Sequence, residues 1–167
     1  MDEGEEREEE VRKQALVHFR LAYEHQMRGD LEQAILNYKR SIDLFPTAEA
    51  HTFLGWTYSF QRRYDEAIEE CKKAIAVDPE FGNPWNDIGA YFIEKGEPHR
   101  APPYLIRATQ ARRYENRSFP WANLARIWEQ VGARFQALEC YRKALAENPN
   151  YTAAQSALRR IQVGLQN

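Results

Sequence analysis

Apolar residues recur along most of the chain at helical spacing, and residues that end helices break this recurrence at regular intervals. Pro46, Pro79 and Pro149 close three of the stretches, because proline cannot continue a helix and disfavours helical geometry in the residue before it. A second set of breaks falls about midway through the stretches, at Gly29, Gly96 and Gly132. The pattern predicts pairs of helices of about a dozen residues each, joined by tight turns.

The same residue types return in register along the chain, which indicates an internal repeat. A column of larger apolar residues reads Leu21, Leu54, Ile88 and Leu124, at intervals of 33, 34 and 36 residues. Two columns of small residues keep these intervals: Ala34, Ala67, Ala101 and Ala137, and then Ser41, Ala74, Ala108 and Ala144. Small residues let helix axes approach closely, and larger residues fill the grooves between them. We therefore expect four repeats, at about residues 15–47, 48–81, 82–117 and 118–151.

The second and fourth repeats carry the fullest pattern. The second has Leu54, Gly55, Tyr58, Ala67, Ala74 and Pro79. The fourth has Trp121, Leu124, Ala125, Trp128, Ala137, Tyr141, Ala144 and Pro149. Over about residues 15–150 the chain resembles the tetratricopeptide repeat family, whose unit carries these residue types at this spacing. The resemblance implies an all-α fold, a right-handed α-solenoid of four helix-turn-helix units, with residues 152–167 as a capping helix and tail.

Two stretches depart from the repeat. Pro102 and Pro103 fall early in the second helix of repeat 3, where at least one helical hydrogen bond must be lost, so we expect that helix to start late or to kink. The join 111–120 is two residues longer than its counterparts and lacks the closing proline. We expect a loop or an extra turn there.

Charge is unevenly distributed along the chain, although the net charge is only −2. Residues 1–10 hold seven acids and one base, which leaves 22 bases and 18 acids, a net charge of +4, from residue 11 onward. Residues 1–14 are expected to form an acidic arm that is solvated and partly disordered, that masks a basic surface, or that extends the first helix backwards. No apolar run suits a signal peptide or a membrane span, so we expect a cytoplasmic protein with no membrane contact.

Catalytic chemistry finds little support in the sequence. No phosphate-binding loop, metalloprotease helix or nucleophile elbow occurs, so we expect no enzyme and no cofactor. His18, His25 and His51 occupy framework columns, which favours packing over a metal site. A run of basic residues consists of Arg100, Arg107, Arg112, Arg113 and Arg117. Because no recognised nucleic-acid-binding motif accompanies it, we do not expect a nucleic-acid partner. The run is expected to be a solvated helix face with a basic loop, and the alternative is a local binding site for an acidic partner.

The segment 51–60 is apolar on two faces of one helix. One face carries the framework residues, and the other carries Phe53, Trp56 and Phe60 at i, i+3, i+7 spacing. One face suffices for packing into the repeat. The second face therefore predicts a partner of its own, because exposed aromatic rings usually mark an interaction surface.

In the family that the chain resembles, the first helices of successive repeats line a concave groove that binds segments of partner proteins. Carried onto this sequence, the resemblance gives an aromatic set of anchors: Phe19, Tyr23, Phe53, Trp56 and Phe60. It also gives a polar set that would orient the partner by hydrogen bonds: Asn86, Asp87, Asn123 and Arg126. We expect a non-catalytic module that binds a protein or peptide partner in this groove. The alternatives are a homo-oligomer, such as a homodimer, that associates through the aromatic set, and cover of these rings by the chain itself.

One branch of the family holds chaperone carboxylates with a clamp of lysines, asparagines and an arginine. The matching positions here are Phe19, Tyr23, Phe53, Asn83 and Asp87. Since none is basic, we expect no chaperone carboxylate clamp and an apolar or aromatic ligand instead.

Overall fold

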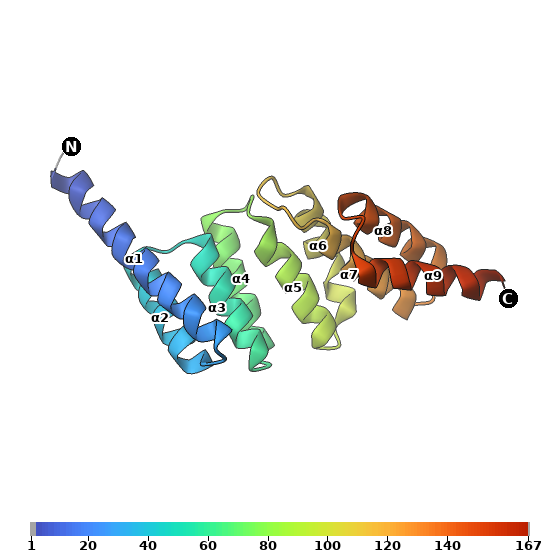
Figure 1. Cartoon of the computed structure of the whole chain (residues 1–167), viewed down its shortest axis with the longest axis horizontal. Coiled ribbons are helices and arrows are strands. Elements are labelled where there is room, and N and C mark those ends of the chain that lie inside the picture. Colours follow the sequence, from blue (N-terminus) through green and yellow to red (C-terminus); the bar gives the residue numbers. More distant parts are fainter. Residues whose placement is uncertain (1–2, 167) are drawn as a thin grey trace. The chain divides into compact units, whose positions relative to one another are not determined.

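The computed structural model describes residues 3–166, and in this range the chain is α-helical apart from its turns, one short 3₁₀ helix and an isolated bridge (Figure 1). The helices are α1 Glu3–Met27, α2 Leu31–Leu44, α3 Ala48–Phe60, α4 Tyr64–Val77, α5 Gly82–Glu94, α6 Pro102–Gln110, α7 Ser118–Gln130, α8 Arg134–Glu147 and α9 Thr152–Gln166. The short helix η1 spans Pro98–Arg100. The predicted all-α repeat fold is confirmed.

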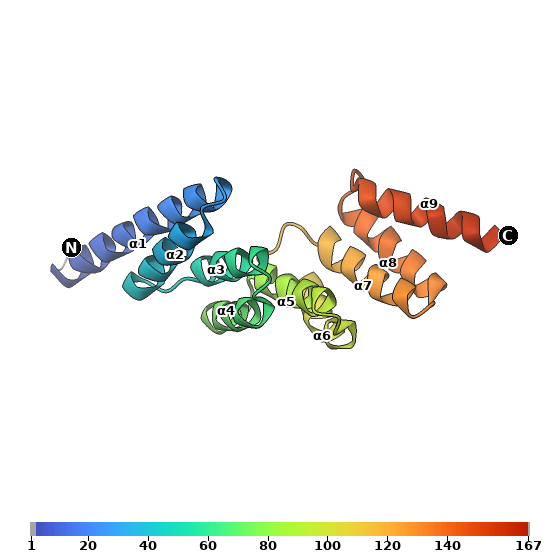
Figure 2. The ribbon, with the colours of Figure 1, turned by 90° about the horizontal axis from the view of Figure 1, so that it is seen from below.

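Helices pair in the order of the chain, α1 with α2, α3 with α4, α5 with α6 and α7 with α8 (Figure 1, Figure 2). Each pair is one repeat. The chain divides into two compact halves, an N-terminal half that ends at Pro79 and a C-terminal half that begins at Glu80. Repeats 1 and 2 form the first, and repeats 3 and 4 with α9 form the second.

Both small-residue columns are buried in all four repeats. Ala34, Ala67, Ala101 and Ala137 are all fully buried. In repeat 2, a Cβ added to Gly55 would lie 2.9 Å from the carbonyl oxygen of Ala67 on α4, which is too close for a side chain. In repeat 2 the small residues therefore mark a close contact between the backbones of α3 and α4.

The turns inside the repeats need a left-handed backbone. Gly29, Gly96 and Gly132 adopt φ angles of 80°, 78° and 74° at equivalent places in repeats 1, 3 and 4. Repeat 2 has Arg62 there, with a φ of 60°. A non-glycine residue in this region is strained, since its Cβ crowds the following carbonyl.

Both predicted departures are observed in the C-terminal half. Helix α6 starts one residue after Ala101, whereas α2, α4 and α8 start three residues before the equivalent alanines, and its first positions are prolines that need no helical donor. Residues 111–117 form a loop. The loop is fixed to the start of α5 by a hydrogen bond from the Gly82 amide to the Arg113 carbonyl (3.0 Å), and Tyr114 is buried beside it.

The acidic segment is helical from Glu3 onward and forms the start of α1, which runs beyond α2 in Figure 1. Asp2 lies outside the described residues. Pairs one helical turn apart, Glu8 with Arg12 and Glu9 with Lys13 (2.8 Å), support the helix, and acids near a helix N-terminus are favourable. At the other end α9 packs on α8 through the buried Ala154, Ala157 and Ile161.

Candidate functional site

The five predicted anchor rings, called here the aromatic stripe (Phe19, Tyr23, Phe53, Trp56 and Phe60), all lie in the N-terminal half and form one continuous set of contacts. Phe53 on α3 lies between the two rings of α1, edge to face, with centroids 5.3 Å from Phe19 and 5.9 Å from Tyr23. Along α3, Phe53 contacts Trp56 at 5.7 Å, and Trp56 contacts Phe60 at 5.2 Å. Edge-to-face contacts between aromatic rings add to the stabilisation that the burial of their apolar surface provides.

Exposure divides the stripe. Tyr23 and Phe60 are 42% and 52% exposed, whereas Phe19, Phe53 and Trp56 are half-buried. Phe53 also meets the fully buried ring of Tyr38 at 6.1 Å, so the inner part of the stripe rests on the core of repeat 1. The stripe thus has a supporting centre and two rings that solvent reaches freely.

A buried hydrogen bond lies beneath the stripe. The Tyr38 hydroxyl donates to Gln26 Oε1 over 2.8 Å, and burial raises the pKa of Tyr38 far above its ordinary value. This bond joins α1 to α2. It fixes the ring on which both Phe19 and Phe53 pack, with the Phe19 centroid 5.5 Å away.

An apolar cleft of about 310 Å³ adjoins the stripe at Phe19. Its lining comes from α1, the end of α2 and the start of α3: Arg12, Ala15, Leu16, Phe19, Ser41, Phe45, Thr47 and Glu49. Sequence reasoning missed this cleft. The available signal was Leu16, which lies three and seven residues before Phe19 and Tyr23 and so shares their helical face.

The polar set lies in the C-terminal half, and three of its members are joined by hydrogen bonds. Asn123 on α7 donates to Asn86 Oδ1 on α5 over 3.1 Å. Arg126 donates to Asn123 Oδ1 over 3.4 Å, and its guanidinium lies 3.7 Å from Glu94 on α5. The first helices of repeats 3 and 4 are therefore connected by a polar network on the predicted groove side.

Asp87, the fourth member, is only partly accessible. Burial raises the pKa of its carboxyl to about 7, opposed by a hydrogen bond from the Asn86 side chain. Burial raises the pKa of the nearby Tyr114, and the negative charge of Asp87 raises it further. No cation contributes to the Asp87 pKa shift, so the desolvation of this carboxyl is not offset by a positive charge.

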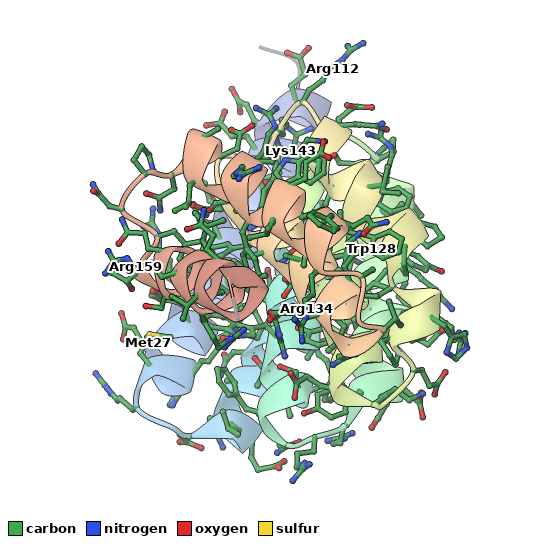
Figure 3. The ribbon with its side chains drawn as sticks, turned by 90° about the vertical axis from the view of Figure 1, so that its right-hand side faces the viewer. Met27, Arg112, Trp128, Arg134, Lys143 and Arg159 are labelled. Carbon is green, nitrogen blue, oxygen red and sulfur yellow. The ribbon has the colours of Figure 1, made fainter. Side chains whose placement is uncertain are left out.

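A further exposed apolar group lies at the turn between α7 and α8, toward the Arg134 end of α8 in Figure 3. Trp128, Val131 and Phe135 are 38%, 67% and 75% exposed. The other repeats carry polar or charged residues at the last two positions: Arg28 and Glu32, Gln61 and Asp65, Lys95 and His99. Sequence reasoning missed this difference, which the repeat register already contains.

The histidines do not converge. His18 pairs with Asn37 (3.1 Å), His25 with Asp30 (3.3 Å) and the buried His51 with Glu70 (2.7 Å). Among residues 3–166 no group of histidine, cysteine, aspartate and glutamate side chains could hold a metal ion. Nor does any helix in that range have the length and apolar character needed to cross a membrane.

The basic run is engaged within the chain. Arg107 binds Glu80 over 2.6 Å, and Arg112 lies 3.9 Å from the same carboxylate. Arg113 stacks over the Phe81 ring at 5.0 Å. These contacts hold the 111–117 loop against the start of α5.

The antiparallel helix pairs and the small-residue columns define a helical repeat protein. Residues 48–81 match the sequence model of the tetratricopeptide repeat, which confirms the resemblance stated from the sequence.

The chain is similar to proteins of type IV pilus assembly. It is 28% identical over 135 residues to the type IV pilus assembly protein PilF of Pseudomonas aeruginosa, which covers 80% of this chain and 54% of PilF. The chain thus spans about half the length of this curated relative. A structure reported for the functional characterization of P. aeruginosa PilF superposes with a TM-score of 0.85 at 25% identity, over 95% of this chain and 71% of that one.

Two further solved structures share the fold at lower identity. PilW, described as a widely conserved type IV pilus biogenesis factor, has a TM-score of 0.79 at 19% identity, over 89% of this chain and 69% of that one. YrrB, described as a tetratricopeptide repeat protein with an unusual peptide-binding site, has a TM-score of 0.69 at 22% identity, over 99% and 85%.

Proposed function

We propose that this chain is a non-catalytic recognition module that captures a segment of a partner protein on the aromatic stripe. The observation that carries the proposal is the second aromatic face of α3, continued by Phe19 and Tyr23 of α1. About half of the surface of Phe60 and of Tyr23 is exposed. A partner could cover this surface at a small cost in side-chain entropy, because an aromatic ring buries a large area while few torsions are fixed.

The supporting contacts favour a preformed surface. Phe53 is held by the buried Tyr38, which is itself fixed by Gln26. A partner that meets rings already held in place loses less conformational entropy on binding than one that must order them. An apolar side chain of the partner would enter the cleft beside Phe19, whose lining is mostly carbon.

The polar set would contribute a second contact, made by hydrogen bonds. Asn86 and Asn123 are oriented by their mutual bond, and Arg126 is held by Glu94. Amide side chains in such a network can accept from and donate to the main chain of a bound segment.

The likeness to PilF favours a partner within a multiprotein assembly, and type IV pilus assembly is the context we propose. PilF supports this context most, since its identity extends over most of this chain. The likeness to PilW and YrrB adds the shared fold.

Affinity capture tests the proposal. Immobilised wild-type chain and the Trp56→Ala, Phe60→Ala double variant are compared in an extract of cells that assemble type IV pili. Phe135→Ala serves as the control, because Phe135 is a similarly exposed ring in the other half. We expect specific prey to be lost only from the double variant, with helicity retained by circular dichroism. Prey retained by the double variant would overturn the proposal, and concentration-dependent light scattering abolished by the double variant would favour the homo-oligomer instead.

A further inference from the structure

Asp87 occupies the groove-side column that holds Arg20, Phe53 and Asn123 in the other repeats, one residue before the buried framework residue Ile88. The residue is partly accessible, in contrast to the buried Asn86 and Ile88 on either side of it. The inference that follows rests on the proposed function and names the chemistry that this position recognises.

The hydrogen bonds around Asp87 orient its neighbour toward it. Asn123 donates to Asn86 Oδ1, which leaves the amide nitrogen of Asn86 to donate to the Asp87 carboxyl. The one nearby cation of the network, Arg126, is held by Asn123 and Glu94. The network thus supplies a neutral donor to Asp87 and keeps the guanidinium on Glu94.

The described cations on the elements packed around α5 contact groups other than Asp87. In the loop, Arg113 lies over the Phe81 ring and Arg117 donates to the Ala111 carbonyl. From the loop, Tyr114 presents a buried phenol, and Tyr151 at the start of α9 lies near Tyr114. On α6, Arg107 lies over Trp85 and binds Glu80. On η1, Arg100 binds Glu97 and lies over Phe92. Among the described residues, no cation contributes to the pKa shift of Asp87, whose causes are burial and the hydrogen bond from Asn86.

A desolvated carboxylate without a counter-ion is unfavourable, and this is the physical reason that its pKa is raised. A cationic side chain brought by a ligand would supply the missing charge at a site that is already desolvated, where an ion pair gains most. We propose that Asp87 selects a lysine or arginine side chain in the segment that the C-terminal half binds. The chain then recognises a basic segment, the opposite charge preference to that of a carboxylate clamp.

A selection experiment tests this inference. A phage-displayed library of random linear peptides is selected on the full-length wild-type chain, on Asp87→Asn and on Glu139→Gln, a control that removes an exposed acid of α8 in the same half. We expect lysine or arginine at one fixed position of the wild-type and Glu139→Gln peptides and no such preference with Asp87→Asn. Asparagine has nearly the shape of aspartate, and circular dichroism checks the fold of each variant.

One selected peptide is then synthesised with its basic residue and with norleucine in its place. We expect the replacement to weaken binding to wild type by at least about tenfold and to Asp87→Asn by less than about twofold. Binding to wild type should strengthen as pH rises from 6 to 8, because the ionised carboxylate is the form that binds the cation. Binding to Asp87→Asn should stay level over the same range.

The outcomes separate the two proposals. Selected peptides that lack a basic preference, or a norleucine replacement that leaves binding to wild type unchanged, overturn the Asp87 inference and leave the recognition module standing. A wild-type chain that selects no peptide overturns both. The norleucine comparison uses the wild-type chain alone, so it decides the matter even where Asp87→Asn folds poorly.

Discussion

The side chain of Asn123 on α7 donates a hydrogen bond to Oδ1 of Asn86 on α5 over 3.1 Å, and so links the first helices of two successive repeats. Asn86 is 8% exposed, so an acceptor that lost this donor would stay buried without compensation. The bond therefore both holds the two helices in register and orients the amide beside Asp87.

Replacing Asn123 with alanine should lower the free energy of unfolding by about 1 to 2 kcal/mol, the usual cost of leaving a buried polar group unpaired. Gln130→Ala, an exposed position at the end of the same helix, should change it by less than about 0.5 kcal/mol. Urea unfolding followed by circular dichroism measures both. Equal effects of the two variants would show that the Asn86 contact contributes nothing to stability.

The two rings Phe53 and Phe60 should differ in their contribution to stability. Phe53 contacts Phe19, Tyr23 and Trp56 as well as the core ring of Tyr38, so Phe53→Ala should cost about 2 to 3 kcal/mol. Phe60 is 52% exposed, and Phe60→Ala should cost less than about 1 kcal/mol. Urea unfolding of the two variants is the measurement. A large loss for Phe60→Ala would mean that this ring belongs to the core and is not free for a partner.

Much of the fold follows from the sequence because repetition makes each structural requirement visible several times. The recurring small residues Ala34 and Ala67 predict buried positions between paired helices, and both are fully buried in the structure. The Pro102–Pro103 pair predicts a late helix start for a local reason, because proline has no backbone N–H to donate to a helical hydrogen bond. Requirements of this kind act within one helix or between adjacent ones.

Exposure at individual framework positions could not be predicted in the same way. Leu21 is 40% exposed although Leu54 in the same column is 1% exposed, because α2 packs on α3 and no described helix precedes α1. Trp128 is 38% exposed although Phe92 is 2% exposed. Phe92 is covered by the Tyr104 ring at 5.6 Å, and the equivalent residue in repeat 4 is the smaller Cys140.

The aromatic and polar sets also combine features that the sequence predicts with features that it does not predict. The repeat register indicates which residues share a face, but the bond between Asn86 and Asn123 spans 37 residues and depends on side-chain orientation. The cleft beside Phe19 needs Phe45, which follows α2, to meet Leu16 on α1. Neither arrangement has a signature within one segment of the sequence.

Stability should depend on pH through Asp87. Its folded pKa of about 7 exceeds the ordinary aspartate value of about 3.9, so between these values the folded state holds a proton that the unfolded state has released. The unfolding free energy therefore falls as pH rises from about 4 to about 7, by about 2 to 4 kcal/mol for this group.

The measurement is the difference in unfolding free energy between wild type and Asp87→Asn at pH 5 and at pH 8, which cancels the groups that the two proteins share. We expect Asp87→Asn to gain stability relative to wild type at pH 8. A difference that is the same at both values would contradict a raised pKa.

The turn of repeat 2 should be improved by glycine. Arg62 holds a φ of 60° where the other repeats have glycine, and left-handed geometry costs a non-glycine residue about 1 to 2 kcal/mol. Arg62→Gly should therefore raise the unfolding free energy by up to about 1 kcal/mol, since glycine loses more chain entropy on folding. The reciprocal change Gly96→Ala, at a φ of 78°, should lower it by about 1 kcal/mol. Thermal and urea unfolding measure the stability of the two variants. A loss of stability in Arg62→Gly would mean that contacts of the arginine side chain stabilise the fold by more than the left-handed backbone destabilises it.

The position of the 111–117 loop against α5 should depend on the absence of a side chain at Gly82. A Cβ at this residue would lie 2.3 Å from the Tyr114 Cβ, whereas the equivalent residues Ala15, Ala48 and Ser118 all carry one. The difference arises because residues 111–117 pass over the start of α5 in this repeat alone, where the Gly82 amide donates to the Arg113 carbonyl and the Arg113 amide donates to the Glu80 carbonyl. Gly82→Ala should displace the loop and cost about 1 to 3 kcal/mol.

Gly164→Ala is the matched control, because Gly164 lies in α9 with open space around it and alanine favours a helix by about 1 kcal/mol over glycine. Amide hydrogen exchange should show faster exchange at residues 82 and 113 in Gly82→Ala and no change there in Gly164→Ala. Protection retained at both amides in Gly82→Ala would mean that the loop accepts the methyl group by a small displacement of Tyr114 that keeps both hydrogen bonds. The loop would then be held to α5 mainly by the hydrogen bonds and by the Glu80 ion pairs with Arg107 and Arg112.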